Sequence, residues 1–142
     1  MLYEQSRAGA AAMDLARELA ERDDAILTVA AVAPQAPSGP RCGNSAVEFN
    51  EVVAESVKQD LDHARHHLGP AAERANFVLL IEGGEPSLAE FASDRGFDLV
   101  LLPARRRLLR SGAHHPEAAR LNVTAGAEIR IVEPAPRRRS PR

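Results

Sequence analysis

FVLLIEGGEPSLAEFASDRGFDLVLLP, residues Phe77–Pro103, contains two apolar runs on either side of a helical pattern. The runs Phe77–Ile81 and Leu99–Leu102 are continuous rather than alternating, which is typical of strands covered on both faces of a parallel sheet. Between them, apolar residues recur at steps of three and four. We expect Pro86 at the first helical position and Gly96 just after the last turn. The segment therefore predicts a βαβ unit with a right-handed crossover.

This unit also predicts where a ligand would bind. Because the two strands are parallel, their carboxyl ends lie at one edge of the sheet. Residues Glu82–Glu85 and Pro103–Arg107 should therefore meet there. Open α/β sheets bind their ligands at that edge.

Length and composition indicate one globular domain. The chain has 142 residues, of which 44% are hydrophobic, enough to bury a sizeable core. We assign residues 1–134 to this domain and 135–142, with Arg137–Arg139, to a disordered basic tail. A single cysteine, Cys42, excludes an intramolecular disulfide. No run approaches the roughly 20 apolar residues of a membrane span, and no signal-peptide pattern is present, so a cytoplasmic location is expected.

The rest of the chain continues the alternation of helices and strands. Helices are expected at Ser6–Arg22, at Ser45–Leu68 with a capping box of Ser45 and Glu48, and at Pro116–Val123, and strands at Ala25–Ala33 and Glu128–Val132. An α/β protein of this kind normally begins with a strand, yet only Met1–Gln5 precede the first helix. We therefore expect one strand to be missing through truncation, since Leu2 and Tyr3 are too few to replace it, which would leave buried backbone groups unpaired.

Three segments resemble the universal stress protein family over nearly the whole chain. They are SRAGAAAMDLARELAERDDAILTVAAVAP, IEGGEPSLAEFASDRGFDLVLLP and AARLNVTAGAEIRIVEP. The resemblance implies a Rossmann-like (adenine nucleotide alpha hydrolase-like) parallel sheet with helices on both faces. The implied strand order is 3-2-1-4-5, with strand 1 missing here. It also implies a homodimer that pairs through the last strand, Glu128–Val132, where pairing would bury Ile129 and Ile131.

The sequence departs from the family at its nucleotide-binding motif. ATP-binding members follow the fourth strand with G-x-x-G and, about nine residues later, Gly-Ser/Thr, because close approach to phosphate needs small residues and backbone donors. Here the corresponding positions carry Pro103, Arg106 and His115-Pro116. The first-strand Asp that contacts adenine in such members would fall near Met1. The resemblance therefore implies a regulatory or binding domain without ATP chemistry and without a cofactor.

Two alternatives stay open. One is a universal stress protein that binds a nucleotide or phosphate through the loop Arg105–Gly112, with weak hydrolysis at most; its anion contacts would be Arg105, Arg106, Ser111 and Gly112. The other is an enzyme of another class on the same fold. No Ser/His/Asp, paired-carboxylate or Walker pattern supports it, so we expect no catalytic residues and no enzymatic activity.

The remaining polar clusters have simpler interpretations. His63, His66 and His67 have a spacing that suits a metal, but we interpret them, and His114-His115, as polar surface. Cys42 is interpreted as an inert surface thiol and Gly83-Gly84 as a turn. The chain is slightly acidic and lacks interleaved aromatic residues, so we expect no nucleic-acid binding; besides a second copy, an unidentified protein remains a candidate partner.

Overall fold

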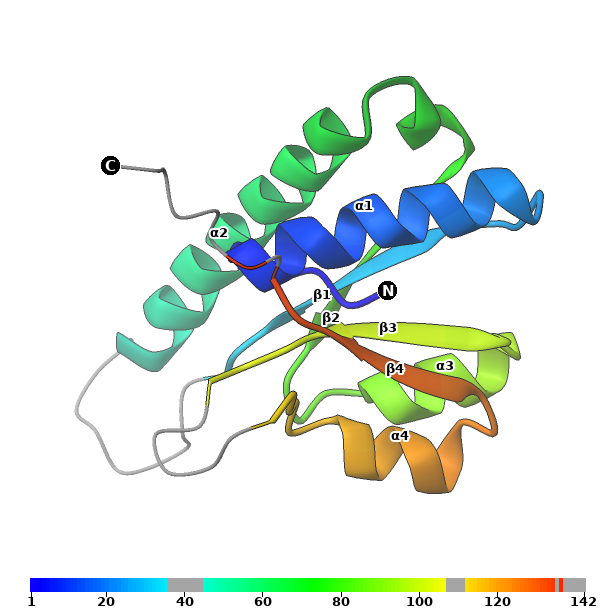
Figure 1. The fold of residues 1–142 in the computed structure, drawn as a ribbon. Helices are drawn as coiled ribbons and strands as arrows, with labels where there is room; N and C mark the ends of the chain where they lie inside the picture. Colours follow the sequence, from blue (N-terminus) through cyan, green and yellow to red (C-terminus); the bar gives the residue numbers. More distant parts are fainter. Residues whose placement is uncertain (36–44, 107–111, 135, 137–142) are drawn as a thin grey trace, which may run out of the picture.

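The computed structural model describes residues 1–35, 45–106, 112–134 and 136, and for residues 45–47 the backbone alone. The elements, in chain order, are α1 (Arg7–Arg22), β1 (Thr28–Ala33), α2 (Ser45–Leu68), a 3₁₀ helix (Gly69–Arg74), β2 (Asn76–Ile81), α3 (Leu88–Arg95), β3 (Leu99–Pro103), α4 (Ala118–Thr124) and β4 (Glu128–Val132). Figure 1 shows α1 and α2 on one side of the strands and α3 and α4 on the other. The predicted α/β fold with helices on both faces is confirmed.

The strands form two parallel pairs that lie side by side. β1 pairs with β2 and β3 pairs with β4, with Val29 opposite Phe77 and Val100 opposite Ile129. Leu2 bridges the two pairs, because it forms a parallel bridge with Ala30 of β1 and donates its N–H to the carbonyl of Leu101 in β3 at 2.9 Å. The spatial order β2-β1-β3-β4, with a short segment in the middle, matches the predicted order with its first strand missing.

The segment Met1–Tyr3 stands in the place of the missing strand. The Ala30 N–H donates to the Met1 carbonyl at 2.9 Å, and the Tyr3 N–H donates to the Ala30 carbonyl at 2.7 Å. The expectation that buried backbone groups beside the gap are left unpaired was therefore partly wrong. They are too few for a strand, but they satisfy backbone groups at the centre of the gap.

Pro103 explains why the pairing beside β3 stops at Leu2. In a parallel ladder, the N–H of the residue two positions after Leu101 would donate to the Leu2 carbonyl. That residue is Pro103, which has no N–H. The chain can therefore leave the sheet directly after Tyr3 and enter α1.

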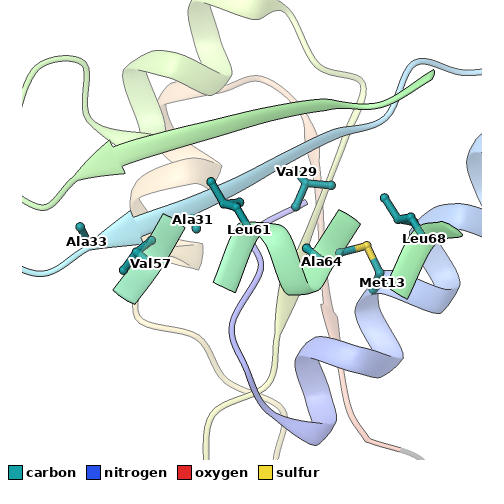
Figure 2. Packing of buried hydrophobic residues seen from close by; sticks show 8 residues of the cluster. All are labelled: Met13, Val29, Ala31, Ala33, Val57, Leu61, Ala64 and Leu68. Carbon is teal, nitrogen blue, oxygen red and sulfur yellow. The ribbon is translucent and has the colours of Figure 1, made fainter. Parts of the chain in front are cut away.

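Each face of the sheet has its own apolar core. Figure 2 shows the first, in which side chains of α2 and Met13 of α1 pack on β1. Its members are Met13, Val29, Ala31, Ala33, Val57, Leu61, Ala64 and Leu68. On the other face, Leu102 of β3 and Leu121 of α4 are fully buried in a second cluster with Leu2, Ala89 and Ala92. Because side chains alternate between the two faces along the buried strands, both faces carry apolar side chains on which helices pack.

The beginning of α3 differs from the prediction. Pro86 is not the first helical residue, because Ser87 caps the helix. The Ser87 hydroxyl accepts the Glu90 N–H at 3.2 Å, and the Glu90 carboxylate accepts the Ser87 N–H at 2.8 Å. This reciprocal capping box satisfies two N–H groups that a Pro86 start would leave open. The predicted stop at Gly96 is confirmed, since Gly96 has φ 63° at the C-cap.

The last strand agrees with the prediction in its bounds but not in the exposure of its side chains. β4 has the predicted bounds, but Ile129 and Ile131 already pack against the Leu102–Leu121 cluster, so a dimer is not needed to bury them. Residues 36–44, with Cys42, and residues 135 and 137–142 of the predicted tail lie outside the described residues, as does the side chain of Ser45 in the predicted capping box. Within the ranges described, no helix is both long enough and apolar enough to cross a bilayer.

Candidate functional site

A cleft of about 580 Å³ lies at the carboxyl ends of the strands. Both loops predicted to meet there contribute to it, through Glu82 and Gly83 after β2 and through Arg105 after β3. Its ionisable lining is mixed and mostly acidic: Glu4, Asp60, Glu82, Glu117, Arg105, Arg120 and His115. Four carboxyl groups face two guanidinium groups, so the charge of this lining is negative on balance.

Glu4, Arg105 and His115 form an ion-pair cluster in this cleft. The Arg105 Nε–H donates to Glu4 Oε1 at 3.0 Å, and a second guanidinium nitrogen contacts the same oxygen. His115 Nε2 lies 3.1 Å from Glu4 Oε1, and the His115 residue is 2% exposed. The prediction that His115 belongs to a polar surface was therefore wrong. Its imidazole is buried and has a carboxylate from the start of the chain as its partner.

Local structure places each member of the cluster. Glu4 follows directly after the Met1–Tyr3 segment and crosses over α1 at Gly9, where a Cβ would stand 1.8 Å from the Glu4 carbonyl oxygen. Glycine is therefore required at position 9 for this crossing. Arg105 comes two residues after β3, and its backbone N–H donates to the His114 carbonyl at 2.6 Å.

The hydrogen bonds of His115 define its tautomer. The Glu117 N–H donates to His115 Nδ1 at 3.2 Å, so Nδ1 acts as an acceptor. Nε2 then carries the proton, and this N–H donates a hydrogen bond to the Glu4 carboxylate. This neutral imidazole orients the Glu4 carboxylate toward Arg105, which supplies the charge that balances it.

The pKa of Glu4 reflects opposing effects. Burial raises the pKa of this carboxyl group, but hydrogen bonds from His115 and Arg105, together with the charge of Arg105, outweigh burial and leave the pKa below its usual value. Glu4 therefore remains ionised at neutral pH and stabilises the fold there. That contribution is present above pH 4.5, the ordinary value for Glu, and is lost as the pH falls through the lower pKa of the folded state.

We expect Glu4→Gln to lower the free energy of unfolding by about 2 kcal/mol at pH 7, because it removes charged hydrogen bonds at a buried imidazole. Urea denaturation at pH 7 and at pH 3 measures the effect. The difference from the unsubstituted protein should shrink at pH 3, which lies below the ordinary pKa of Glu, because the unfolded chain then takes up a proton at Glu4. Glu21→Gln, at an exposed position of α1, is the control and should change stability by less than about 0.5 kcal/mol. A loss of equal size at both pH values would contradict the assignment of the charge.

The residues predicted to contact an anion are only partly brought together. Arg105, Arg106 and Gly112 line a second cavity of about 720 Å³, together with Glu133 and the first residues of α1. Ser111 lies outside the described residues. Arg105 and Arg106 are both exposed, but Arg105 is already paired with Glu4.

The other candidate residues have structural explanations. His63, His66 and His67 are exposed on α2, where His67 Nε2 lies 2.7 Å from Asp14 Oδ1, and the prediction of a polar surface is confirmed for them. Within the described ranges, no group of three metal-ligating side chains comes together. Gly83 has φ 71° in the turn after β2, as predicted.

The Glu4–His115 pair was missed because its members are 111 positions apart and neither lies in a motif.

These features define a Rossmann-like α/β domain with an incomplete central strand and a charged cleft at its ligand edge. Its fold is that of the universal stress proteins. One similar structure is a protein of the universal stress protein family from Burkholderia pseudomallei, with a TM-score of 0.65, 20% identity, and coverage of 94% of this chain and 92% of that chain. No family model and no curated protein matches the sequence.

Two further solved structures agree with this assignment of the fold. Universal stress protein UspA from Lactobacillus plantarum aligns with a TM-score of 0.69 and 17% identity over 92% of this chain and 93% of its own. A universal stress protein from Archaeoglobus fulgidus aligns with a TM-score of 0.60 and 16% identity over 92% of both chains. The resemblance read from the sequence therefore extends to the tertiary structure.

Proposed function

We propose that this protein is a universal-stress-protein-like regulatory or binding domain that works in the cytoplasm without ATP chemistry and without enzymatic activity. The observation that carries the proposal is the Glu4 carboxylate at the ligand edge. It pairs with Arg105, the arginine nearest the end of β3, and it is oriented by the buried His115. A negative charge therefore stands where an anionic ligand would need a positive one.

The backbone at this edge supports the same proposal. Phosphate cradles are built from consecutive N–H groups that a ligand can approach closely. β3 ends in Pro103, which has no N–H, and Arg106 carries a long side chain three residues later. Asp60, Glu82 and Glu117 line the cleft as well and would repel a triphosphate.

The alternative is nucleotide or phosphate binding through the arginine loop. The observation in its favour is the cavity of about 720 Å³ lined by Arg7, Arg105 and Arg106. Against it, Glu4 and Glu133 line the same cavity, and Glu4 engages Arg105. Binding through exposed guanidinium groups would be screened over about 8 Å at physiological salt.

Calorimetric titration with ATP, GTP and pyrophosphate, at 20 and 150 mM salt, separates the two functions. We expect binding weaker than about 1 mM at the higher salt, with equal affinity for all three ligands, because screened charge attraction does not read the base. Arg106→Ser should reduce the low-salt signal, whereas Arg95→Ser, outside the loop, should not. Adenine-selective binding that resists salt would contradict the proposal and favour the alternative, as would release of phosphate from ATP.

We also propose a homodimer that pairs antiparallel through β4. Its support is the unpaired outer edge that β4 presents in the described part of the chain, since it hydrogen-bonds to β3 alone. Glu128 and Arg130 alternate with Ile129 and form an ion pair at 2.8 Å within the strand. A register centred on Ile129 would place Glu128 of each copy opposite Arg130 of the other.

This register predicts a charge-swap result. Arg130→Glu should weaken the dimer by about tenfold or more, since it places like charges opposite each other twice, and the double variant Glu128→Arg with Arg130→Glu should restore it. Sedimentation velocity between 1 and 100 µM protein measures both. A single monomeric species across this range would contradict the dimer, and equal dissociation of the single and double variants would contradict the register.

A further inference from the structure

β2 forms the outer edge of the sheet on the side opposite β4. Within the residues that the structure describes, β2 hydrogen-bonds to β1 alone, over its whole length Asn76–Ile81. Its other side carries a row of main-chain groups to which no described strand is paired. Such a row is a template for pairing with another chain.

The sequence of β2 lacks the features that usually protect a solvent-exposed edge. Those features are charged side chains, proline and β-bulges. The segment NFVLLI, Asn76–Ile81, has no charge and no proline, and its register with β1 runs one to one from Thr28–Asn76 to Ala33–Ile81. Six residues of high β propensity without charge, proline or glycine are typical of a segment that pairs with further strands.

The outward-facing main-chain groups of β2 belong to its odd-numbered residues. In a parallel ladder, alternate residues of a strand bond to the same neighbour. The Asn76 N–H donates to the Leu27 carbonyl at 2.9 Å, so the even-numbered residues bond to β1. Phe77, Leu79 and Ile81 therefore turn their N–H and C=O groups toward the open edge.

The same three residues share one face of the sheet. Phe77 and Leu79 are partly buried against the core cluster between α2 and β1, and Ile81 is 49% exposed. The Arg65 guanidinium of α2 lies 4.5 Å from the centre of the Phe77 ring. The Ile81 carbonyl accepts the Gly84 N–H at 2.9 Å, and its oxygen can accept a second hydrogen bond. The row is thus covered at Phe77 and open at Ile81.

An antiparallel second copy of β2 complements this row. With Leu79 on the two-fold axis, Leu79 exchanges both main-chain hydrogen bonds with its counterpart, and Phe77 does the same with Ile81 of the other copy. Ile81 is then covered by the Phe77 ring of the other copy. Asn76 stands opposite Glu82 at both ends, where an amide can donate to a carboxylate. The edge is therefore complementary to itself.

Charge does not oppose this pairing. Arg65, which borders the edge, is balanced by Asp62, since its Nη1 donates to Asp62 Oδ1 at 2.7 Å. Arg74, just before the strand, has its Nη2 2.9 Å from Asp24 Oδ1. Because the strand itself is uncharged and Glu82 faces a neutral amide, the register centred on Leu79 brings no like charges opposite each other along β2.

We propose that β2 is a homotypic interaction edge, which pairs antiparallel with β2 of a second copy and joins the two sheets into one. The proposal is independent of ATP binding and of pairing through β4, which uses the opposite edge. Where both edges pair, each copy has two separate two-fold contacts. Copies then join in a row rather than in a closed dimer.

Register-specific cross-linking tests the proposal. In the register centred on Leu79, Asn76 and Glu82 of two copies form a non-hydrogen-bonded pair with Cα atoms about 4.5 Å apart, which suits a disulfide. Cys42, the single cysteine of the sequence, is first replaced by the substitution Cys42→Ser. Asn76→Cys and Glu82→Cys are then made in separate proteins, mixed and oxidised, and non-reducing electrophoresis measures the covalent dimer.

We expect a covalent dimer from the mixture and at least tenfold less from either protein alone. Two cysteines at the same position would lie six residues apart along the paired strands, about 20 Å, which is too far for a disulfide. Equal cross-linking in all three samples would indicate random collision. That result, or no cross-link in any sample, would overturn the proposal.

A substitution at the exposed end of β2 tests the same contact without cysteines. Ile81→Lys should weaken self-association at least tenfold, because its ammonium group would meet the Phe77 ring of the other copy, on which Arg65 already lies. Val123→Lys is the matched control, since Val123 is 88% exposed on α4, which packs against α3 and β4. Sedimentation velocity measures both in the Arg130→Glu background, in which pairing through β4 is weakened. Circular dichroism checks the fold, and equal association of the two variants would contradict the β2 contact.

Discussion

The free energy of unfolding should rise between pH 5 and pH 8, because the folded protein buries the α-amino group of Met1. Burial lowers the pKa of this amine from 8.0 to about 5. Between these values the unfolded chain holds a proton that the folded chain has released, so raising the pH favours the folded state. Between pH 5 and pH 8 the free energy of unfolding should therefore rise by roughly 4 kcal/mol at most.

Urea denaturation at half-unit steps from pH 5 to pH 8 measures this dependence. The matched control carries Lys58→Arg, which removes the single lysine of the sequence, and is acetylated at its α-amine. In this protein the titrating amine is gone while every histidine remains. The free energy of unfolding of the acetylated protein should vary less with pH. It should exceed that of the protein with a free amine by the largest amount near pH 5. Parallel profiles for the free and acetylated proteins would show that the amine is not buried in solution.

A large loss of stability is expected for the substitution Leu61→Ala in α2. Leu61 is 5% exposed and packs in the cluster that joins α2 to β1, where Figure 2 shows it among Val29, Val57 and Ala64. Truncation removes buried methyl groups and leaves a cavity beneath the helix. The free energy of unfolding should fall by about 3 kcal/mol.

Val52→Ala on the same helix is the control, because Val52 is 69% exposed. It should change stability by less than about 0.5 kcal/mol, since little buried apolar surface is lost and Ala is only modestly better than Val in a helix. Chemical denaturation of both variants under the same conditions provides the comparison. Similar losses at positions 52 and 61 would mean that α2 packs through a different face.

Local sequence patterns were sufficient to predict most of the elements. The apolar runs Phe77–Ile81 and Leu99–Leu102 became β2 and β3, and Ser6 caps α1, its hydroxyl accepting the Gly9 N–H at 2.9 Å. These predictions hold because periodicity and capping act over a few residues. The start of α3 was misplaced because two local signals, Pro86 and the Ser87–Glu90 box, compete within four positions.

The strand order was predicted through the family resemblance, and the gap in it through the absence of a strand before α1. What the sequence could not reveal is how the gap is held. Met1–Tyr3 pair with Ala30 and Leu101, which are distant in the chain and carry no pattern that marks them as partners. Such pairing depends on the packing of both sheet halves against their helices.

The composition and motifs of the sequence by themselves determined the α/β class, the order of its helices and strands, and the loss of the glycine motif after β3. The tertiary structure decided the chemistry of the two ends of the sheet. It brought Glu4 to Arg105 and His115 across more than a hundred positions, and it buried the Met1 amine against the Thr28 carbonyl. Contacts of this range arise when the whole chain folds, so a single sequence offers no local signal for them.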